Sequence, residues 1–294
     1  MNKRLHLLLA LLLVLTQLMP ALANGGKEDN ALLWKITGKG LKKPSYLYGT
    51  IHAVCPDKMV ISETLQKALG QTEQLSLELD MDDPDMMSQF MMLSTLPEGQ
   101  SLKAMFTKEE YEAVGALFKS TYGADLQFVD NLKPFVLYSM LIPVLTECTP
   151  ESYEQKLMNL AHSQQKEVLG IESVQEQMAV VDELPNKFYV DMVTRTATNL
   201  AKSRAEYSEM VDLYFAQDLK GLQELMQRDY SKEEYRRFNE AFLVKRNRNW
   251  IPVMERMAKD KPTFFAVGAA HLSGEEGVVA LLRKQGYKVE PVQK

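Results

Sequence analysis

The stretch that decides the fold is PTFFAVGAAHLSGEEGVVALLRKQGYKVEPV, residues 262–292. Its apolar start predicts a strand that turns at Gly268, the middle has helical spacing, and YKVEPV predicts a short final strand. A strand, a helix and a strand in this order predict a β-α-β unit. His271 follows Gly268 by three residues, just past the end of the first predicted strand.

The same Gly-x-x-His spacing occurs near the other end of the chain, in YLYGTIHAV, residues 46–54. Here His52 follows Gly49, and the preceding residues predict a hairpin around a Gly/Lys/Pro turn. Ligand sites in parallel α/β sheets gather at the carboxyl ends of the strands. Two such turns on neighbouring strands would therefore bring the two imidazoles face to face.

Two carboxylates are expected at the same edge of the sheet. Glu78 lies near the end of the strand predicted by TEQLSLELDM, and Glu172 ends the strand predicted by KEVLGIES. Two imidazoles with one or two carboxylates suit zinc, manganese or another divalent first-row ion. In the alternative interpretation, the histidines only satisfy local hydrogen bonds and the glutamates are solvated strand ends.

Arg246, in VKRNRNW, is a further candidate for the site. A guanidinium near such an edge can hold a carboxylate or stabilise developing negative charge. The alternative is an arginine on the surface of a helix. Of the other histidines, His162 is expected to be exposed on a polar helix, and His6 lies in the N-terminal leader.

The predicted strands come from both ends of the chain and the middle is mainly helical. We therefore expect an α/β fold with a mixed, largely parallel central sheet built from both chain ends. A large helical insertion is predicted at about residues 81–245, within one domain at residues 24–294. The methionines of the first insertion helix, DMMSQFMMLS, are interpreted as core filler.

The N-terminus has the pattern of a secretory signal peptide. Lys3 and Arg4 precede an apolar run, and the small-residue site Ala-Leu-Ala ends at Ala23. The apolar run is shorter than the roughly 20 residues of a membrane span. We expect a signal peptide at residues 1–23, cleavage near Ala23, and a periplasmic or secreted mature chain without a stable membrane anchor.

Composition narrows the classes of partner and chemistry. Charged residues make up 25% of the chain and apolar residues 46%, as in ordinary globular proteins, and the net charge of −5 argues against a nucleic-acid partner. Cys55 and Cys148 are the two cysteines of the chain. In an exported protein they either form a disulfide or stay as two unpaired buried thiols, and their spacing fits no zinc pattern.

Five segments in order resemble the landmarks of the TraB/GumN family, which is related to the Tiki proteases: YLYGTIH, LSLELDMDDP, EVLGIESVQEQ, RNRNW and the stretch from FFAVGAAHL to the end. In that family, paired Gly-x-x-His motifs are thought to frame the active site. The resemblance maps His52 and His271 to the motif histidines, Glu78 and Glu172 to two acidic strand residues, and Arg246 to the arginine of an "RN" segment.

The Tiki proteases are divalent-metal-dependent and act near the N-terminus of secreted or membrane substrates. The resemblance therefore implies an exported, metalloprotease-like hydrolase of a peptide or protein substrate, with manganese, cobalt or zinc as its cofactor. In this interpretation His52, Glu78 and His271 hold the ion, Glu172 activates water and Arg246 steadies the oxyanion. We expect no C-terminal membrane anchor of the Tiki kind in this chain, which would be a departure from the Tiki pattern.

Two other functions are compatible with the sequence. A non-catalytic protein could use the same cleft to bind a peptide, a metal or a haem group, without needing a general base. Alternatively, the helical insertion could bind a partner protein while the cleft is vestigial.

Overall fold

The computed structural model describes residues 30–292, so the predicted signal peptide lies outside the described residues. Six strands form one sheet in the order β4-β3-β5-β2-β1-β6. Their bounds are β1 (Leu33–Thr37), β2 (Ser45–Thr50), β3 (Gln74–Leu77), β4 (Glu167–Gly170), β5 (Thr263–Gly268) and β6 (Lys288–Pro291).

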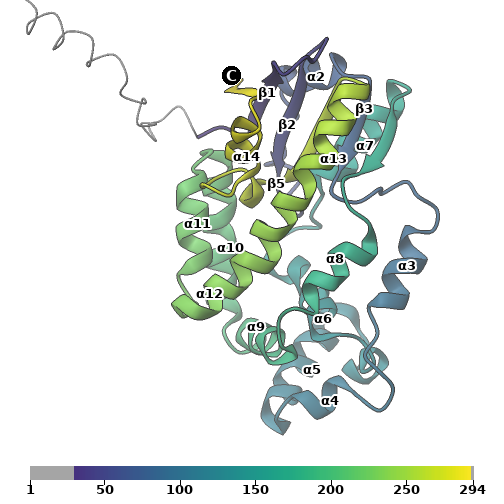
Figure 1. Cartoon of the computed structure of the whole chain (residues 1–294). Coiled ribbons are helices and arrows are strands. Elements are labelled where there is room, and N and C mark those ends of the chain that lie inside the picture. Colours follow the sequence, from purple (N-terminus) through teal and green to yellow (C-terminus); the bar gives the residue numbers. More distant parts are fainter. Residues whose placement is uncertain (1–29, 293–294) are drawn as a thin grey trace, which may run out of the picture.

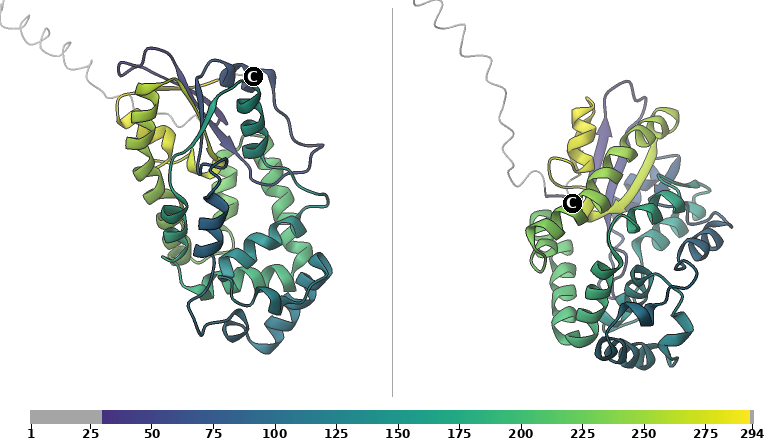
Figure 2. Two further views of the ribbon diagram at one scale, coloured as in Figure 1. Left: turned by 90° about the vertical axis from the view of Figure 1, so that its right-hand side faces the viewer. Right: turned by 60° about the horizontal axis from the view of Figure 1, so that its bottom comes forward.

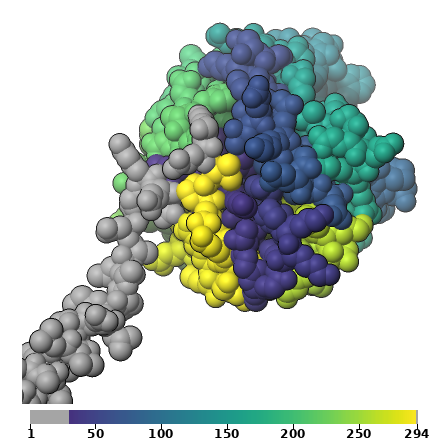
Figure 3. All heavy atoms as spheres, turned by 90° about the horizontal axis from the view of Figure 1, so that it is seen from above, coloured from purple at the N-terminus to yellow at the C-terminus, as the bar shows by residue number. Residues whose placement is uncertain are grey.

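The sheet is mixed and largely parallel, as the sequence predicts. β5 pairs in parallel with β2 and with β3, and β3 pairs in parallel with β4. β1 forms the predicted hairpin with β2 and also pairs antiparallel with β6. The final strand of the predicted β-α-β unit is thus separated from β5 by two strands of the N-terminal hairpin. Figure 3 shows the resulting contact, with the two chain ends side by side on one face of the molecule.

Helices cover both faces of the sheet (Figure 2). α2 and α7 lie on one face and α13 and α14 on the other (Figure 1). α10 and α11 lie below α14 and add residues to the core around the sheet, and most of the other helices form the lower part of the molecule. The helices are α2 (Glu63–Gly70), α3 (Met86–Leu93), α4 (Leu102–Met105), α5 (Lys108–Tyr122), η2 (Leu126–Val129), α6 (Pro134–Leu145), α7 (Tyr153–Ser163), α8 (Val174–Val181), α9 (Asn186–Thr198), α10 (Leu200–Phe215), α11 (Leu219–Gln227), α12 (Lys232–Asn239), η3 (Glu240–Lys245), α13 (Arg246–Asp260), η4 (Ala269–His271) and α14 (Val278–Lys284).

The described residues form three hydrophobic cores: one around the sheet, one in the helical part and one around α8. The largest one packs around the sheet, and it buries Trp34, Leu47, Phe264 and Phe265 almost completely. A smaller core joins α4, α5, α6 and α9 in the helical part. Each part therefore buries its own apolar surface. The carboxyl ends of β2, β3 and β5 point toward the helical part (Figure 1).

The Met-rich helix α3 does not match its interpretation as core filler. None of its residues is fully buried, and Met87, Met91 and Met92 are each more than half exposed. Met86 and Phe90 are only partly buried against the neighbouring cluster around α8. The helix is short and lies at the edge of the molecule (Figure 1), so one face alone can contact the core.

A disulfide joins Cys55 to Cys148, with 5.8 Å between their Cα atoms. Next to it, Val54 and Glu151 form an isolated antiparallel bridge. Together they tie the loop after β2 to the segment that leads into α7. In residues 30–292, none of the helices has a stretch long and apolar enough to cross a bilayer.

Candidate functional site

The two Gly-x-x-His segments leave neighbouring strands at the same edge of the sheet. β2 and β5 pair in parallel with Thr50 opposite Gly268, so both chains turn at the same level. Gly49 is required by packing, because a Cβ atom there would lie 2.6 Å from Leu272 Cδ1 and 3.1 Å from Ala269 Cα. The glycine thus lets the end of β2 lie close to the segment that follows β5.

Gly268 marks the point where the candidate side chains converge. A Cβ atom on this glycine would lie 3.4 Å from Glu78 Oε1, 3.6 Å from His52 Nε2 and 3.6 Å from His271 Cδ2. These three side chains come from the ends of β3, β2 and β5 respectively. The structure therefore brings together residues that are far apart in the sequence.

Arg246, at the start of α13, binds both candidate carboxylates. Its Nη2 atom lies 2.6 Å from Glu78 Oε2 and 2.5 Å from Glu172 Oε1. All three side chains are buried, and the guanidinium lies over the Trp250 ring, 4.7 Å from its centroid. This burial excludes the alternatives of a surface arginine and of solvated strand-end glutamates.

The two glutamates differ in how their oxygens are used. Both oxygens of Glu172 accept hydrogen bonds: Oε2 from Trp250 Nε1 at 2.8 Å, and Oε1 from Arg246 and from Gln177 Nε2. Glu78 Oε1 accepts the backbone N–H of Gly268 at 2.8 Å and lies 3.8 Å from His271 Nε2. Glu78 Oε1 is therefore the carboxylate oxygen that faces the histidines.

Both imidazoles are oriented through their Nδ1 atoms. His52 Nδ1 lies 2.9 Å from Glu154 Oε1, and His271 Nδ1 lies 2.6 Å from Asn247 Oδ1. The His271 ring also packs on Trp250, with 4.4 Å between ring centroids. His52 Nε2 faces the point of convergence, whereas His271 Nε2 lies 3.2 Å from Arg246 Nη1 and 3.8 Å from Glu78 Oε1. The Nδ1 partners fix which ring nitrogen carries the proton.

The two histidines have opposite electrostatic environments. Attraction to Glu154 raises the pKa of His52 to about 9, although two thirds of the side chain is exposed. Burial lowers the pKa of His271 to about 3, helped by the nearby guanidinium of Arg246. Burial also opposes ionisation of Glu78, but Arg246 and the histidines outweigh it and lower its pKa to about 2. The site therefore combines a neutral buried imidazole with an ionised carboxylate.

A π-helical segment, η3, places the arginine. It spans Glu240–Lys245 and runs directly into α13, where Arg246 Nη1 donates back to the carbonyl of Phe242. α13 buries Arg246, Trp250 and Met254 on one face, at helical spacing of four residues. Such wide turns occur often at functional sites, where they change which side chains face inward.

Comparisons with known proteins identify the family of this chain. A family model described as the TraB/PrgY/gumN family matches residues 32–291. The chain belongs to this family. It is also 23% identical to "Metalloprotease TIKI2" of Danio rerio, over 90% of this chain and 61% of the relative. "Metalloprotease TIKI1" of Homo sapiens is 24% identical, over 90% of this chain and 62% of the relative.

The chain thus spans about three fifths of the length of these two relatives. A third relative, "Metalloprotease TIKI homolog" of Nematostella vectensis, is 22% identical over 91% of this chain and 68% of its own length. No solved structure matches the chain. All three relatives are named as metalloproteases, and each is similar to this chain over about nine tenths of its length.

Several residues of the site in this TraB/PrgY/gumN protein escaped the sequence analysis. Asn247 and Trp250 stand beside the predicted Arg246 in RNRNW, and the four-residue spacing of Arg246 and Trp250 could have indicated a shared helix face. Glu154 carried no signal, because an acidic residue in the first turn of a helix is common. Gln177, in the helix after Glu172, also looked like an ordinary surface residue.

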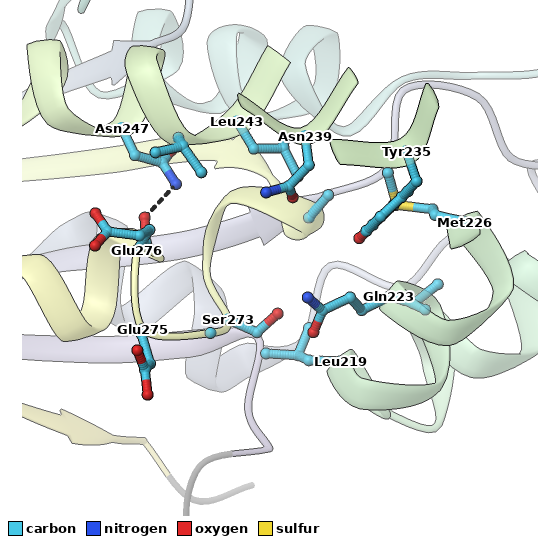
Figure 4. A pocket seen from close by; sticks show the side chains of 14 residues that line it. Leu219, Gln223, Met226, Tyr235, Asn239, Leu243, Asn247, Ser273, Glu275 and Glu276 are labelled. Atoms are coloured by element: carbon cyan, nitrogen blue, oxygen red, sulfur yellow. Dashed lines mark hydrogen bonds between the residues drawn. The ribbon is translucent and has the colours of Figure 1, made fainter. Parts of the chain in front are cut away.

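A cavity of about 160 Å³ is lined in part by Ala270 and Ser273, which flank His271 in the sequence (Figure 4). It is lined by residues of α11, α12, η3 and the loop after β5, among them Gln223, Tyr235 and Ser273. Asn247 lines it as well, and Figure 4 shows its amide bonded to the Glu276 carbonyl. The cavity therefore touches the support of His271 but none of the five candidate residues.

Proposed function

We propose that this chain is an exported, metal-dependent hydrolase of peptide bonds, acting on a peptide or protein substrate. The observation that carries the proposal is the convergence of His52 Nε2, Glu78 Oε1 and the His271 ring around Gly268. The printed names of the relatives support the same reaction. The leader sequence and the Cys55–Cys148 disulfide support export to an oxidising compartment.

The donor chemistry of the site fits a divalent ion. In both histidines, Nδ1 faces an oxygen that can accept its proton in a hydrogen bond. In metalloproteins this arrangement leaves Nε2 as the nitrogen that binds the metal. Within residues 30–292, however, no group of three or more His, Cys, Asp or Glu side chains is arranged to hold an ion as it stands. Arg246 Nη1 lies 3.2 Å from His271 Nε2, the nitrogen that would bind the ion. The guanidinium would therefore have to move away from this nitrogen before an ion could bind there.

In this proposal His52, Glu78 and His271 hold manganese, cobalt or zinc. A divalent ion there lowers the pKa of a bound water and polarises a carbonyl. The protein's own contribution is orientation, because the Nδ1 partners fix both rings and the Gly268 N–H fixes Glu78 Oε1. Gly268 keeps the centre of the site open, since any side chain there would enter it.

The bonds of the two glutamates favour a different division of roles from the sequence-based one. Glu172 accepts from Arg246 on both oxygens and from Trp250 on Oε2, which makes it a poor acceptor for a water proton. We therefore assign Glu172 to holding Arg246. The guanidinium, released from His271 Nε2, can then donate to a developing oxyanion.

Cleavage of a broad peptide library by the mature chain tests this proposal. The protein is treated with a chelator, and cleavage is followed with and without added manganese or cobalt, alongside metal analysis of the untreated protein. We expect metal-dependent cleavage that H52A and H271A abolish. Both variants are checked by circular dichroism, because His271 is buried.

H162A is the matched control, since His162 is the other described histidine and lies near the surface in an ion pair with Asp82. It should cleave as the unmodified protein does. A protein that binds the metal or a peptide without cleaving would favour the non-catalytic alternative. Cleavage that survives both H52A and H271A would contradict the proposed site.

A further inference from the structure

Glu154, the partner of His52 Nδ1, is a buried acidic residue outside the five candidate residues of the site. It lies in the first turn of α7, and its exposed fraction is only 8%. An acidic residue at this position usually faces solvent and stabilises the helix through its dipole. Burial is costly for a carboxylate unless it is hydrogen-bonded, so its partners must explain its position.

Those partners are both on the segment that carries the first Gly-x-x-His turn. Glu154 Oε1 accepts from the Thr50 hydroxyl at 2.5 Å and lies 2.9 Å from His52 Nδ1. An ionised carboxylate has no proton to donate. The proton between Glu154 and His52 therefore lies on Nδ1, and the lone pair of a neutral His52 ring is at Nε2.

The distance between α7 and the His52 segment is fixed independently of this contact. The backbones of Val54 and Glu151 exchange hydrogen bonds of 3.0 and 2.9 Å, and the adjacent disulfide closes the same gap. On the other side, Tyr207 donates to the carbonyl of Ala53 at 2.6 Å.

Tyr214, also on α10, donates to the carbonyl of Gly49 at 2.9 Å. The whole turn is thus held by elements from two parts of the chain. Because these contacts hold the turn in place, Glu154 lies at a fixed distance from the His52 imidazole.

We propose that Glu154 is the positioning residue of the site: through Thr50 and His52 Nδ1 it fixes the ring so that Nε2 points at Gly268. This proposal depends on the proposed function in one respect only, namely that the ligand of His52 Nε2 is a metal ion. Partners of this kind typically contribute 10- to 100-fold, as an order of magnitude, to metal affinity. The Nδ1 partner of His271 is the neutral amide of Asn247. His52, the more exposed histidine, is therefore the one with a charged partner.

The test combines nitrogen-15 NMR of the histidine rings with titration of the chelator-treated protein by Mn²⁺. The variants are Glu154→Ala, Glu154→Gln and Thr50→Val. At a pH where the ring is neutral, unmodified His52 should carry its proton on Nδ1. Glu154→Ala should mix the two tautomers and weaken Mn²⁺ binding roughly 10- to 100-fold.

Glu154→Gln keeps an oxygen acceptor of the same shape, so it should keep the tautomer and lose less affinity than Glu154→Ala. Thr50→Val should shift the tautomer in the same direction as Glu154→Ala, but less. Glu151→Gln is the matched control, because its side chain in the same segment only pairs with Lys156 at the surface. It should change neither readout.

At a pH where the His52 ring is neutral, a proton on Nε2 instead of Nδ1 in the unmodified protein overturns the proposal, and this measurement needs no variant to fold. An unchanged tautomer in a folded Glu154→Ala protein overturns it as well. If the unmodified protein binds no Mn²⁺, the proposed function fails on the metal, while the tautomer still decides the role of Glu154.

Discussion

Arg246 and Glu78 form a buried ion pair, with 2.6 Å between Nη2 and Oε2, although 168 residues separate them in the sequence. The pair joins the end of β3 to the start of α13. Because Glu172 shares the same guanidinium, one positive charge compensates two buried carboxylates. Arg246 is therefore both a candidate catalytic group and the residue on which the electrostatics of the site depend.

Replacing Arg246 by Met should destabilise the protein strongly. Both carboxylates would stay buried without their partner, and breaking such a pair typically costs about 3–5 kcal/mol. The free energy of unfolding, measured in urea, should fall by that order. Arg248→Met is the control, because its pair with Glu276 is exposed and such pairs contribute roughly 0–1 kcal/mol. Equal losses of unfolding free energy in the two variants would show that the buried ion pairs stabilise the protein no more than an exposed one.

Gly268→Ala should separate function from stability. The backbone there has an ordinary φ of −52°, and the new methyl group would make contacts of 3.4 Å or more. We expect the free energy of unfolding to change by less than about 1 kcal/mol. The methyl group nevertheless fills the point where His52, Glu78 and His271 converge, so Mn²⁺ binding and cleavage should be lost.

Gly49→Ala gives the opposite expectation on the neighbouring strand. Its Cβ would lie 2.6 Å from Leu272 Cδ1 and 3.1 Å from the backbone of Ala269. Overpacking of this kind costs about 1–3 kcal/mol. Thermal unfolding followed by circular dichroism compares the two variants. A Gly49→Ala protein as stable as Gly268→Ala would contradict the tight packing described for the turn.

The sequence predicted the strands of the sheet well because their signals are local. Apolar runs ended by glycine located β2 and β5, and the rule that sites lie at carboxyl ends of parallel strands brought His52 and His271 to one edge. It did not reveal that β5 lies between β2 and β3. Strand order depends on long-range pairing, which leaves no mark in a single strand.

Side-chain partners were harder to predict than positions. Glu154 looks like any first-turn acidic residue, and only the fold shows that it faces His52. The methionines of α3 have helical spacing, but spacing does not tell whether the face they form meets a core or solvent. In both cases the missing information is what lies opposite the helix.

Removing the disulfide should destabilise the contacts that hold the His52 turn. Cys55 and Cys148 are 93 residues apart, and a bridge that closes a loop of this size contributes about 3–5 kcal/mol in the chain-entropy model. Cys55→Ala with Cys148→Ala should lower the free energy of unfolding by that order. The unmodified protein in excess reductant should approach the same value. A loss below about 1 kcal/mol would mean that the Val54–Glu151 bridge alone holds the segment.

Metal addition gives a test of the ligand set that does not depend on finding a substrate. An ion that binds the folded chain at 100 times its dissociation constant should raise the free energy of unfolding by about 2.7 kcal/mol. His52→Ala should abolish this gain, and its own effect on the unliganded protein is measured without metal, because buried Glu154 loses one of its partners. His162→Ala should keep the gain in full. If Mn²⁺ or Zn²⁺ stabilises His52→Ala as much as the unmodified protein, the ion binds elsewhere and the paired histidines do not form its site.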